Sequence, residues 1–443
     1  MLTYQDLATH TYRNTRPVLA NLDVTDLVRA SVLAKLDLAL MGNTGSGKTQ
    51  LAKGDIFNGW FNGNKKEGGN GIFLRAHPEI DIYHEIFTEL NLERAQRELT
   101  TDIEALVYLV DELNRAPPVS QNQFLGLGDG VMDHKGRAIK LGRRGYHLLI
   151  ATANLGNGEF QGTFDIDKAL YNRLHVILDM DHPDFKPTRE DKFELRGRRA
   201  DPNVKEAPKK DLSELIIDAS EAIGLKTVEP GLETIAVAHF LEFGLDHCLN
   251  SGKTGLAGPK GKVWPINCQD CPFNTDGKAV CSKIKAPVER TIEATIRYAA
   301  ALEYLAQLKN QDQRISATDL MFKSFELTGA YQFLLNPGTL RQEYVNENPR
   351  FMSEVVRQLK DEFNKRKDFV ITSMEQAQRG KRMTRFFWAK NGKGEDAFSN
   401  YDGLSELAKA KIQPVEPFTD AEQLGFAWVN DYINFLIKNR TWT

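Results

Sequence analysis

The stretch that decides the fold is Gly42-Asn43-Thr44-Gly45-Ser46-Gly47-Lys48-Thr49, which matches the pattern G-x-x-x-x-G-K-[S/T] in full. It follows an apolar run at residues 36–41 and precedes a helical pattern at 49–61. Glycines here let successive backbone N–H groups surround phosphate oxygens, and the next helix points its positive end at them. The motif therefore predicts a phosphate-binding loop, in which Lys48 contacts the β- and γ-phosphates and Thr49 ligates Mg²⁺. The alternative is a chance glycine-rich turn.

The first half of the chain alternates short apolar runs with helical patterns, which is typical of a parallel β-sheet covered by helices. Five strands are expected, at residues 36–41, 71–75, 105–110, 147–152 and 175–178. From about residue 184 apolar residues recur every three to four positions, which indicates helices. The clearest helical patterns are at residues 212–223, 231–248 and 288–308.

Composition excludes several classes of protein. The 443 residues include 57 Lys and Arg against 60 Asp and Glu, so the net charge of −3 gives no global reason to coat nucleic acid. The first twenty residues lack the apolar segment of a signal peptide, and no run of 18 apolar residues predicts a membrane span. Four cysteines are too few for a disulfide scaffold in a chain of this length. We expect a soluble, intracellular protein of the cytoplasm.

An acidic pair, Asp111-Glu112, ends the apolar run at residues 105–110. In nucleotide hydrolases with this kind of loop, an acid at the end of a neighbouring strand completes the Mg²⁺ shell. We therefore expect Asp111 to hold Mg²⁺ together with Thr49. Glu112 is expected to orient and polarise the water that attacks the γ-phosphate of ATP.

Residues 110–125, VDELNRAPPVSQNQFL, resemble the region around these acids (Walker B) in the MoxR family of AAA+ ATPases. A helical pattern at 121–127, a hairpin pattern at 131–141 and a strand ending in Asn154 follow in the family's order. The resemblance covers about residues 17–325. It implies an α/β AAA+ core at 1–183, with a parallel sheet, then an α-helical lid at 184–330 and a helical C-terminal extension at 331–443.

The resemblance also implies roles for two further residues. Asn154 would position the lytic water together with Glu112, although an asparagine here can also simply cap the strand end. Arg173 would be an arginine finger that reaches the γ-phosphate held by a neighbouring subunit. The alternative for Arg173 is a surface ion pair. Residue 172 is Asn where the family usually has Asp, which leaves the partner of the finger open.

A second nucleotide-sensing arginine is implied near the start of the helical pattern at 288–308. Arg290 is the first choice, and Arg297 lies about two turns further along. A solvated arginine on an exposed helix is the alternative for both.

Family members typically work as rings, so the resemblance implies ATP hydrolysis at the subunit interfaces of a homo-oligomer, expected to be a hexamer. It also implies remodelling or maturation of a protein partner, such as one with a von Willebrand factor A domain. The rival interpretation is a nucleic-acid-directed AAA+ motor or anti-phage defence component. It depends on the cysteine segment and on a basic stretch at residues 357–385 that is followed by Phe386-Phe387-Trp388.

All four cysteines fall in one window inside the expected lid. They are Cys248, Cys268, Cys271 and Cys281, with a C-x₂-C pair in the middle. In an intracellular chain this spacing favours a metal site over disulfides. Four thiolates suit Zn²⁺ and equally suit a [4Fe–4S] cluster, and Cys271-Pro272-Phe273 resembles the Cys-Pro-aromatic stretch of some iron–sulfur nucleases. Such a site would order an insertion at about 248–286; merely buried thiols are the alternative.

Overall fold

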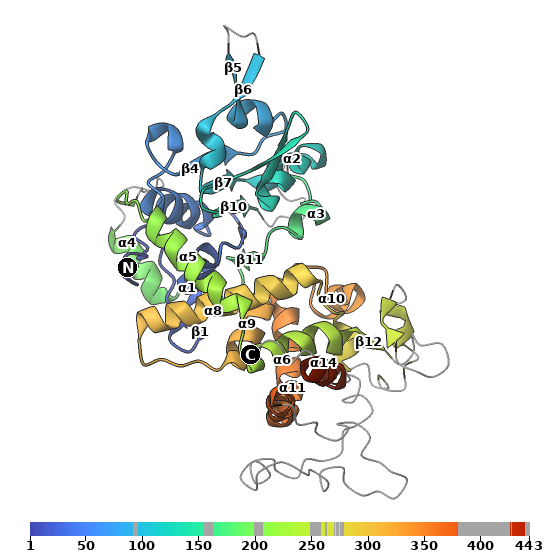
Figure 1. Ribbon diagram of the computed structural model, residues 1–443. Helices are drawn as coiled ribbons and strands as arrows, with labels where there is room; N and C mark the ends of the chain where they lie inside the picture. Colours follow the sequence, from blue (N-terminus) through green and yellow to red (C-terminus); the bar gives the residue numbers. More distant parts are fainter. Residues whose placement is uncertain are drawn as a thin grey trace, which may run out of the picture. The chain divides into compact units, whose positions relative to one another are not determined.

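The computed structural model describes most of the chain. The described residues are 1–91, 96–154, 163–198, 207–248, 258–261, 264–269, 271, 274, 279–379, 426 and 428–438. The chain forms two compact units, which are treated separately below (Figure 1). The first consists of Met1–Glu229 and Arg297–Ser316, and the second of Pro230–Ile296 and Ala317–Thr443. The domain boundaries expected at residues 183 and 330 differ from the limits of these units and stay a prediction.

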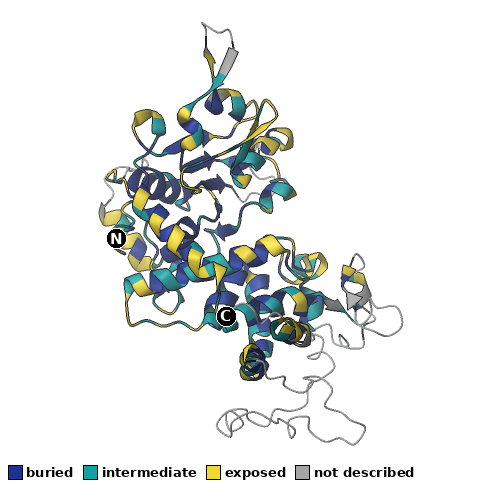
Figure 2. Ribbon diagram, viewed as in Figure 1, coloured by how far each residue is buried: buried dark blue, intermediate teal, exposed yellow. Residues whose placement is uncertain are grey.

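The first unit is built on a five-stranded, fully parallel sheet with the strand order β11-β3-β10-β7-β4. The strands are β3 (Leu38–Met41), β4 (Gly71–Arg75), β7 (Val107–Asp111), β10 (Leu148–Ala153) and β11 (Val176–Asp179). The α/β fold class is therefore confirmed, and each of the five expected strands is present to within two residues at either end. Every residue of the three central strands β3, β10 and β7 is buried, and Figure 2 shows these strands in dark blue. Burial on both faces explains why the sequence runs are continuously apolar.

Parallel register places the functional segments at one edge of this sheet. β10 pairs with β3 on one side and with β7 on the other. Because the carboxyl ends of parallel strands meet at the same edge, the glycine-rich loop after β3, the acids Asp111 and Glu112 at the end of β7 and Asn154 after β10 come together there.

Helices and short hairpins complete the first unit. They include α1 (Val24–Ala34), η1 (Gln50–Trp60), η5 (Leu113–Arg115), α2 (Pro118–Asp129), α3 (Lys168–Tyr171), α4 (Arg189–Arg198) and α5 (Ser213–Val228). The helix expected after the glycine-rich loop is present, although η1 is wound as a π-helix. The expected hairpin is confirmed as β8 (Val131–His134) paired with β9 (Arg137–Lys140).

A second hairpin was not expected from the sequence. It joins β5 (Thr88–Asn91) to β6 (Gln96–Leu99) and lies between β4 and β7 along the chain. Its strands are short and mostly polar, so they lack the apolar alternation that signals a strand.

The second unit is mostly helical. Its main helices are α6 (Leu232–His239), which continues as η6 (Phe240–Gly244), α9 (Ala317–Gly329), α10 (Pro337–Glu343), α11 (Asn348–Gln378) and α14 (Trp428–Lys438). Aromatic rings fill the space between them: Phe240 lies 5.4 Å from Phe363 and 5.1 Å from Phe426, measured between ring centroids. No helix in the described part of the chain combines the length and apolar character needed to cross a membrane.

The helix expected at residues 231–248 ends early. Helical structure runs to Asp246, and His247–Cys248 (β12) instead pairs with Gly258–Pro259 (β13). The backbone of these last two residues gains ladder hydrogen bonds by pairing as a strand.

Candidate nucleotide-binding site

The glycine-rich loop has the backbone that its sequence predicts. It joins the buried strand β3 directly to η1. Gly45 and Gly47 have φ angles of 87° and 89°, a region that residues with a side chain rarely adopt. At Gly47 a Cβ atom would also lie only 2.7 Å from a ring carbon of Tyr12. Glycine at position 47 is therefore required both by the turn and by the close approach of Tyr12.

Lys48 is held over the loop. Its side-chain ammonium donates hydrogen bonds to the carbonyl oxygens of Gly42 (2.7 Å) and Asn43 (2.8 Å) and to Ser46 Oγ (3.3 Å). Burial lowers the pKa of Lys48, and nearby carboxylates, Asp181 foremost, oppose that shift. The Lys48 ammonium thus lies at the loop. Its N–H groups could donate to phosphate oxygens in place of the loop's own carbonyl oxygens.

Thr49 and Asp111, the expected Mg²⁺ ligands, are in contact. Thr49 Oγ1 donates to Asp111 Oδ1 at 3.3 Å. Thr152 Oγ1 on β10 donates to the same carboxylate oxygen at 2.6 Å, and it accepts from the backbone N–H of Glu112 at 3.0 Å. A hydroxyl and a carboxylate beside a phosphate-binding loop are the oxygen ligands that Mg²⁺ prefers, so these residues fit the ion.

Glu112 follows Asp111 in a strained backbone conformation. Its φ angle of 56° and ψ angle of 45° place it in the left-handed region, which is uncommon for a residue with a side chain. Its carboxylate forms a two-point ion pair with Arg115, at 2.9 Å from Nε to Oε2 and 3.2 Å from Nη2 to Oε1. The structure therefore places Glu112 beside the predicted Mg²⁺ ligands and pairs it with Arg115, for which the sequence predicts no role.

Asn154 is fixed through its backbone. The Asn114 side chain donates from Nδ2 to the Asn154 carbonyl at 3.0 Å and accepts from the Asn154 N–H at 3.3 Å. Asn114 lies in η5, two residues beyond Glu112. These contacts tie the residue after β10 to the segment after β7, and the water-positioning role of Asn154 stays a prediction.

Arg173 is ion-paired within its own chain. Its Nε and Nη2 atoms lie 2.9 and 2.7 Å from Asp129 Oδ2, at the end of α2, and its Nη1 donates to the Ala169 carbonyl at 3.0 Å. The alternative stated for this residue, an ion pair, is thus present in the single chain. An arginine finger acts on a neighbouring subunit, so that role stays a prediction.

The two candidate sensor arginines lie in different units. Arg297 donates to the carbonyl of Ala34 and, at 3.2 Å, to Ser220 Oγ. It therefore ties α8 (Glu289–Lys309) to α1 and α5 within the first unit. Arg290 belongs to the second unit, whereas the glycine-rich loop belongs to the first. The sensing role of Arg290 therefore stays a prediction.

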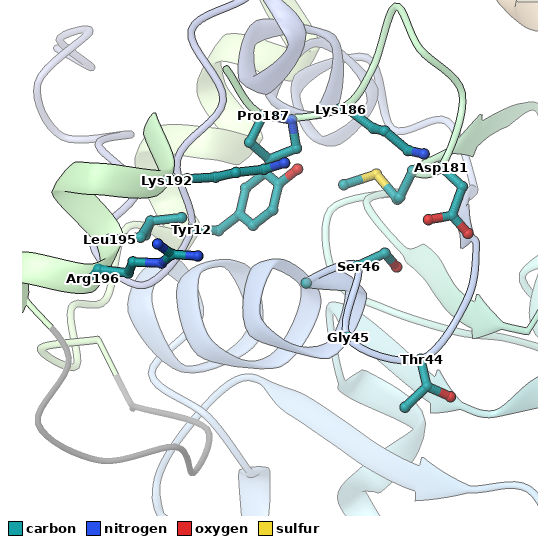
Figure 3. Close-up of a pocket in the computed structure, with 12 residues that line it drawn as sticks. Tyr12, Thr44, Gly45, Ser46, Asp181, Lys186, Pro187, Lys192, Leu195 and Arg196 are labelled. Carbon is teal, nitrogen blue, oxygen red and sulfur yellow. The ribbon is translucent and has the colours of Figure 1, made fainter. Parts of the chain in front are cut away.

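A cavity of about 450 Å³ lies beside residues 44–47 of the glycine-rich loop (Figure 3). Loop residues 44–47 form one wall, Tyr12 another, and Lys192 and Arg196 of α4 a third. Tyr12 is placed there by Asp55 of η1, whose carboxylate accepts hydrogen bonds from the backbone N–H groups of residues 10, 11 and 12 at 2.6 to 2.9 Å.

The cysteines lie near one another without forming a coordination group. Burial raises the pKa of Cys268 to about 11, and the neighbouring thiols of Cys281 and Cys248 raise it further. Among the residues that the structure describes, no three His, Cys, Asp or Glu side chains are placed to hold a metal ion. The chemistry of four thiols suits Zn²⁺ or an iron–sulfur cluster, whereas their arrangement here does not form such a site.

Comparison with known proteins finds similar solved structures but no family. No protein-family model and no curated protein matches the chain. Among solved structures, the chain is similar to a presumed ATPase from Cytophaga hutchinsonii, with 13% sequence identity and a TM-score of 0.48. The similarity covers 75% of this chain and 88% of that protein.

Sequence reasoning missed several residues of the site. Thr152 carried a usable signal, since it is a polar residue inside an otherwise apolar strand next to Asp111. Tyr12 and the cationic residues of α4 carried none, because their positions depend on how distant segments pack against the loop.

Proposed function

We propose that this chain is an ATPase of the AAA+ type that hydrolyses ATP with Mg²⁺. The observation that carries the proposal is the contact between Thr49 and Asp111 beneath a complete phosphate-binding loop. It joins the loop after β3 to the acid that ends β7, across the intervening strand β10. This arrangement has the parts that phosphoryl transfer to water requires: a phosphate cradle, oxygen ligands for Mg²⁺, and a carboxylate beside them.

The residues divide the work as follows. Backbone N–H groups of the loop and the Lys48 ammonium bind the phosphates and balance their charge. Thr49 and Asp111 hold Mg²⁺, which supplies electrostatic stabilisation to the transferring phosphoryl group. Glu112 accepts the proton of the attacking water, and Asn154 orients that water. Asp111 stays ionised as a ligand and Thr152 holds it in place, at 2.6 Å.

The proposal extends to assembly and partners. The resemblance of residues 110–125 to the MoxR family supports a ring, which we take to be a homohexamer, in which Arg173 completes the site of the adjacent subunit. It also supports a protein client, such as one with a von Willebrand factor A domain, that the ring remodels or matures.

Three of the basic residues of α11 give the nucleic-acid alternative no support. Lys360 pairs with Asp319 at 2.5 Å, and Lys367 pairs with Glu233 at 2.6 Å. Arg366 is buried. Charges balanced by acids within the same unit are poorly available to phosphates, and residues 380–425, which include the three aromatics, lie outside the described part of the chain.

Lys48→Ala tests nucleotide binding at the loop. Because its charged hydrogen bonds to phosphate are lost, we expect ATP affinity to fall by about 10- to 100-fold, and hydrolysis with it. Calorimetric titration with ATP and Mg²⁺ measures the affinity, and phosphate release measures the rate. Lys66→Ala, at an exposed lysine of the short helical turn at residues 65–67, is the matched control and should change neither. Equal behaviour of the two variants would remove the loop from the mechanism.

The four thiols lie near enough to one another to raise the pKa of Cys268, although they do not form a coordination group as they stand. We propose that one Zn²⁺ ion or one [4Fe–4S] cluster draws them together in the folded protein. Protein purified without oxygen should contain either one zinc or four irons per chain, measured by metal analysis, with visible absorption only for the cluster. Cys268→Ser should lose the metal and lower the melting temperature, since metal binding stabilises the fold. Four thiols that react freely in metal-free, fully folded protein would refute the site.

A further inference from the structure

Helix α2 holds the segment that carries Arg173. The helices α2 and α3 lie side by side in the first unit (Figure 1). The stem of Arg173 crosses α2 at Gly128, where a Cβ atom would lie only 2.9 Å from Arg173 Cβ. Its guanidinium then pairs with Asp129, the last residue of α2. The direction of the Arg173 side chain therefore depends on how α3 is placed against α2.

One buried side chain, that of Gln121, joins α2 to the segment before α3. Its Nε2 donates to the carbonyl oxygens of Ala116 at 2.9 Å and Asp165 at 3.0 Å, and its Oε1 accepts from the Asp167 N–H at 2.6 Å. These partners fix the orientation of the amide, because the reverse orientation would face donor with donor and acceptor with acceptor. Gln121 is 0% exposed, so water does not replace the lost partners when the amide is removed.

Asp167 connects Gln121 to Arg173. It is the N-cap of α3, and its carboxylate accepts a hydrogen bond from the Ala169 N–H at 2.7 Å. A capping residue fixes where a helix begins and how the chain enters it. Because α3 has only about one turn, and the Arg173 N–H donates to the Leu170 carbonyl at 2.9 Å, a displaced Asp167 displaces Arg173 as well.

A second buried amide in the same stretch, that of Asn114, has a different partner. Its side chain bonds to both backbone polar groups of Asn154, at 3.0 and 3.3 Å. Asn154 and Glu112 belong to the site of their own chain, whereas Arg173 is expected to act on the site of a neighbour. The residues that follow the acidic pair thus hold both elements through side chains, Asn114 the end of β10 and Gln121 the start of α3.

We propose that Gln121 is a positioning residue for the arginine finger, so that its loss impairs the active site of the neighbouring subunit and not the site of its own. The inference rests on the proposed function, because it takes Arg173 to be a finger in a ring. It goes beyond that function by assigning a role in trans to a buried residue outside the loop and the acidic pair.

Gln121→Met keeps the length of the side chain and removes all three hydrogen bonds. We expect turnover to fall about 10- to 100-fold, because a finger misplaced by about 1 Å loses much of its effect. ATP affinity should stay within about twofold of the wild type, since the loop is unchanged. Gln123→Met is the matched control: its amide on the same helix bonds to the backbone of Ile80 and Ile82, and its loss should keep wild-type turnover. Phosphate release and calorimetry measure the two quantities.

Mixed rings show in which subunit the defect lies. In equal mixtures of Gln121→Met and Glu112→Gln subunits, about a quarter of interfaces join an intact site to a correctly placed finger, so turnover should rise to about a quarter of the wild-type value. Gln121→Met mixed with Arg173→Ala should not recover, because no subunit then supplies a working finger. A residue that serves its own site would give the reverse, with recovery only in the second mixture.

Asp167→Ala provides a second route to the same test. It removes the cap of α3 from a partly exposed position, so it does not disturb the core around Gln121, and it should repeat the mixing pattern of Gln121→Met. Wild-type turnover of Gln121→Met would overturn the inference alone. So would the reverse pattern, or no recovery in either mixture while Arg173→Ala recovers with Glu112→Gln. Failure of that last pair to recover would instead remove the finger in trans, and the inference with it.

Discussion

Glu112→Gln protein should bind ATP with nearly the affinity of the wild type and hydrolyse it at least about a hundredfold more slowly, because general base catalysis contributes that much or more. Glutamine keeps the size of the side chain but cannot accept the proton of the attacking water. The Mg²⁺ ligands Thr49 and Asp111 are untouched, so binding persists. The ion pair to Arg115 is lost, but both side chains are substantially exposed, and such pairs contribute little to stability.

Phosphate release under saturating ATP measures the rate, and calorimetry with ATP measures the affinity. Glu229→Gln, at an exposed carboxylate just past the end of α5, is the matched control and should keep wild-type turnover. Turnover of the Glu112 variant within about threefold of the wild type would show that another group activates the water.

The same variant also identifies the partner. Held in its ATP-bound form in its native host, it should retain a client that the wild type releases. A discrete co-purifying protein would support remodelling, whereas nuclease-sensitive nucleic acid would support the motor alternative. The ion pairs of α11 favour the first outcome, because they leave Lys360 and Lys367 already neutralised.

The parts of the structure that could be predicted are those that local sequence determines. Strands buried on both faces must be continuously apolar, so the three central strands could be predicted. The two edge strands, β4 and β11, are mostly buried and could be predicted for the same reason. The loop at residues 42–49 is recognisable because its glycines meet a backbone requirement that few sequences satisfy, as the φ angle of 89° at Gly47 shows. Parallel pairing then fixes which strand ends meet, which is why Thr49 and Asp111 could be placed together before the structure was known.

The parts that could not be predicted depend on contacts between distant segments. Tyr12 reaches the loop only because Asp55, 43 residues later, accepts hydrogen bonds from the backbone of residues 10 to 12. No local pattern encodes such a contact. Arg115 lay in a quoted motif, but its pairing with Glu112 follows from the left-handed turn at position 112, which sequence does not reveal. The spacing of the four cysteines predicts that they act together as metal ligands. How their sulfur atoms are arranged depends on the insertion that carries them, and several residues of that insertion lie outside the described part of the chain.

Arg173→Ala should reduce ATP hydrolysis by about a thousandfold if Arg173 acts as a finger on the neighbouring subunit. Within one chain the guanidinium is bound by Asp129 and by the Ala169 carbonyl, which could equally mark a residue that only stabilises the fold. Asp129→Asn separates these roles. It removes the ion pair and leaves the arginine, and because both side chains are partly exposed, the pair itself contributes only about 1 kcal/mol or less.

If Arg173 is a finger, its loss should therefore abolish turnover while Asp129→Asn retains most of it. If the arginine is structural, the two variants should instead lose similar, small amounts of stability and activity, seen in melting temperature and phosphate release.

Mixing two inactive variants tests action in trans directly. In a ring assembled from equal amounts of Arg173→Ala and Glu112→Gln subunits, some interfaces join an intact Glu112 to an intact Arg173 from the neighbour. Random assembly makes that about a quarter of all interfaces, so turnover should rise to about a quarter of the wild-type value. A finger acting within its own chain gives no such recovery, because every subunit in the mixture then carries one defect in its own site. Recovery on mixing would thus establish both the ring and the role of Arg173, and its absence would leave Arg173 paired with Asp129 as a structural residue.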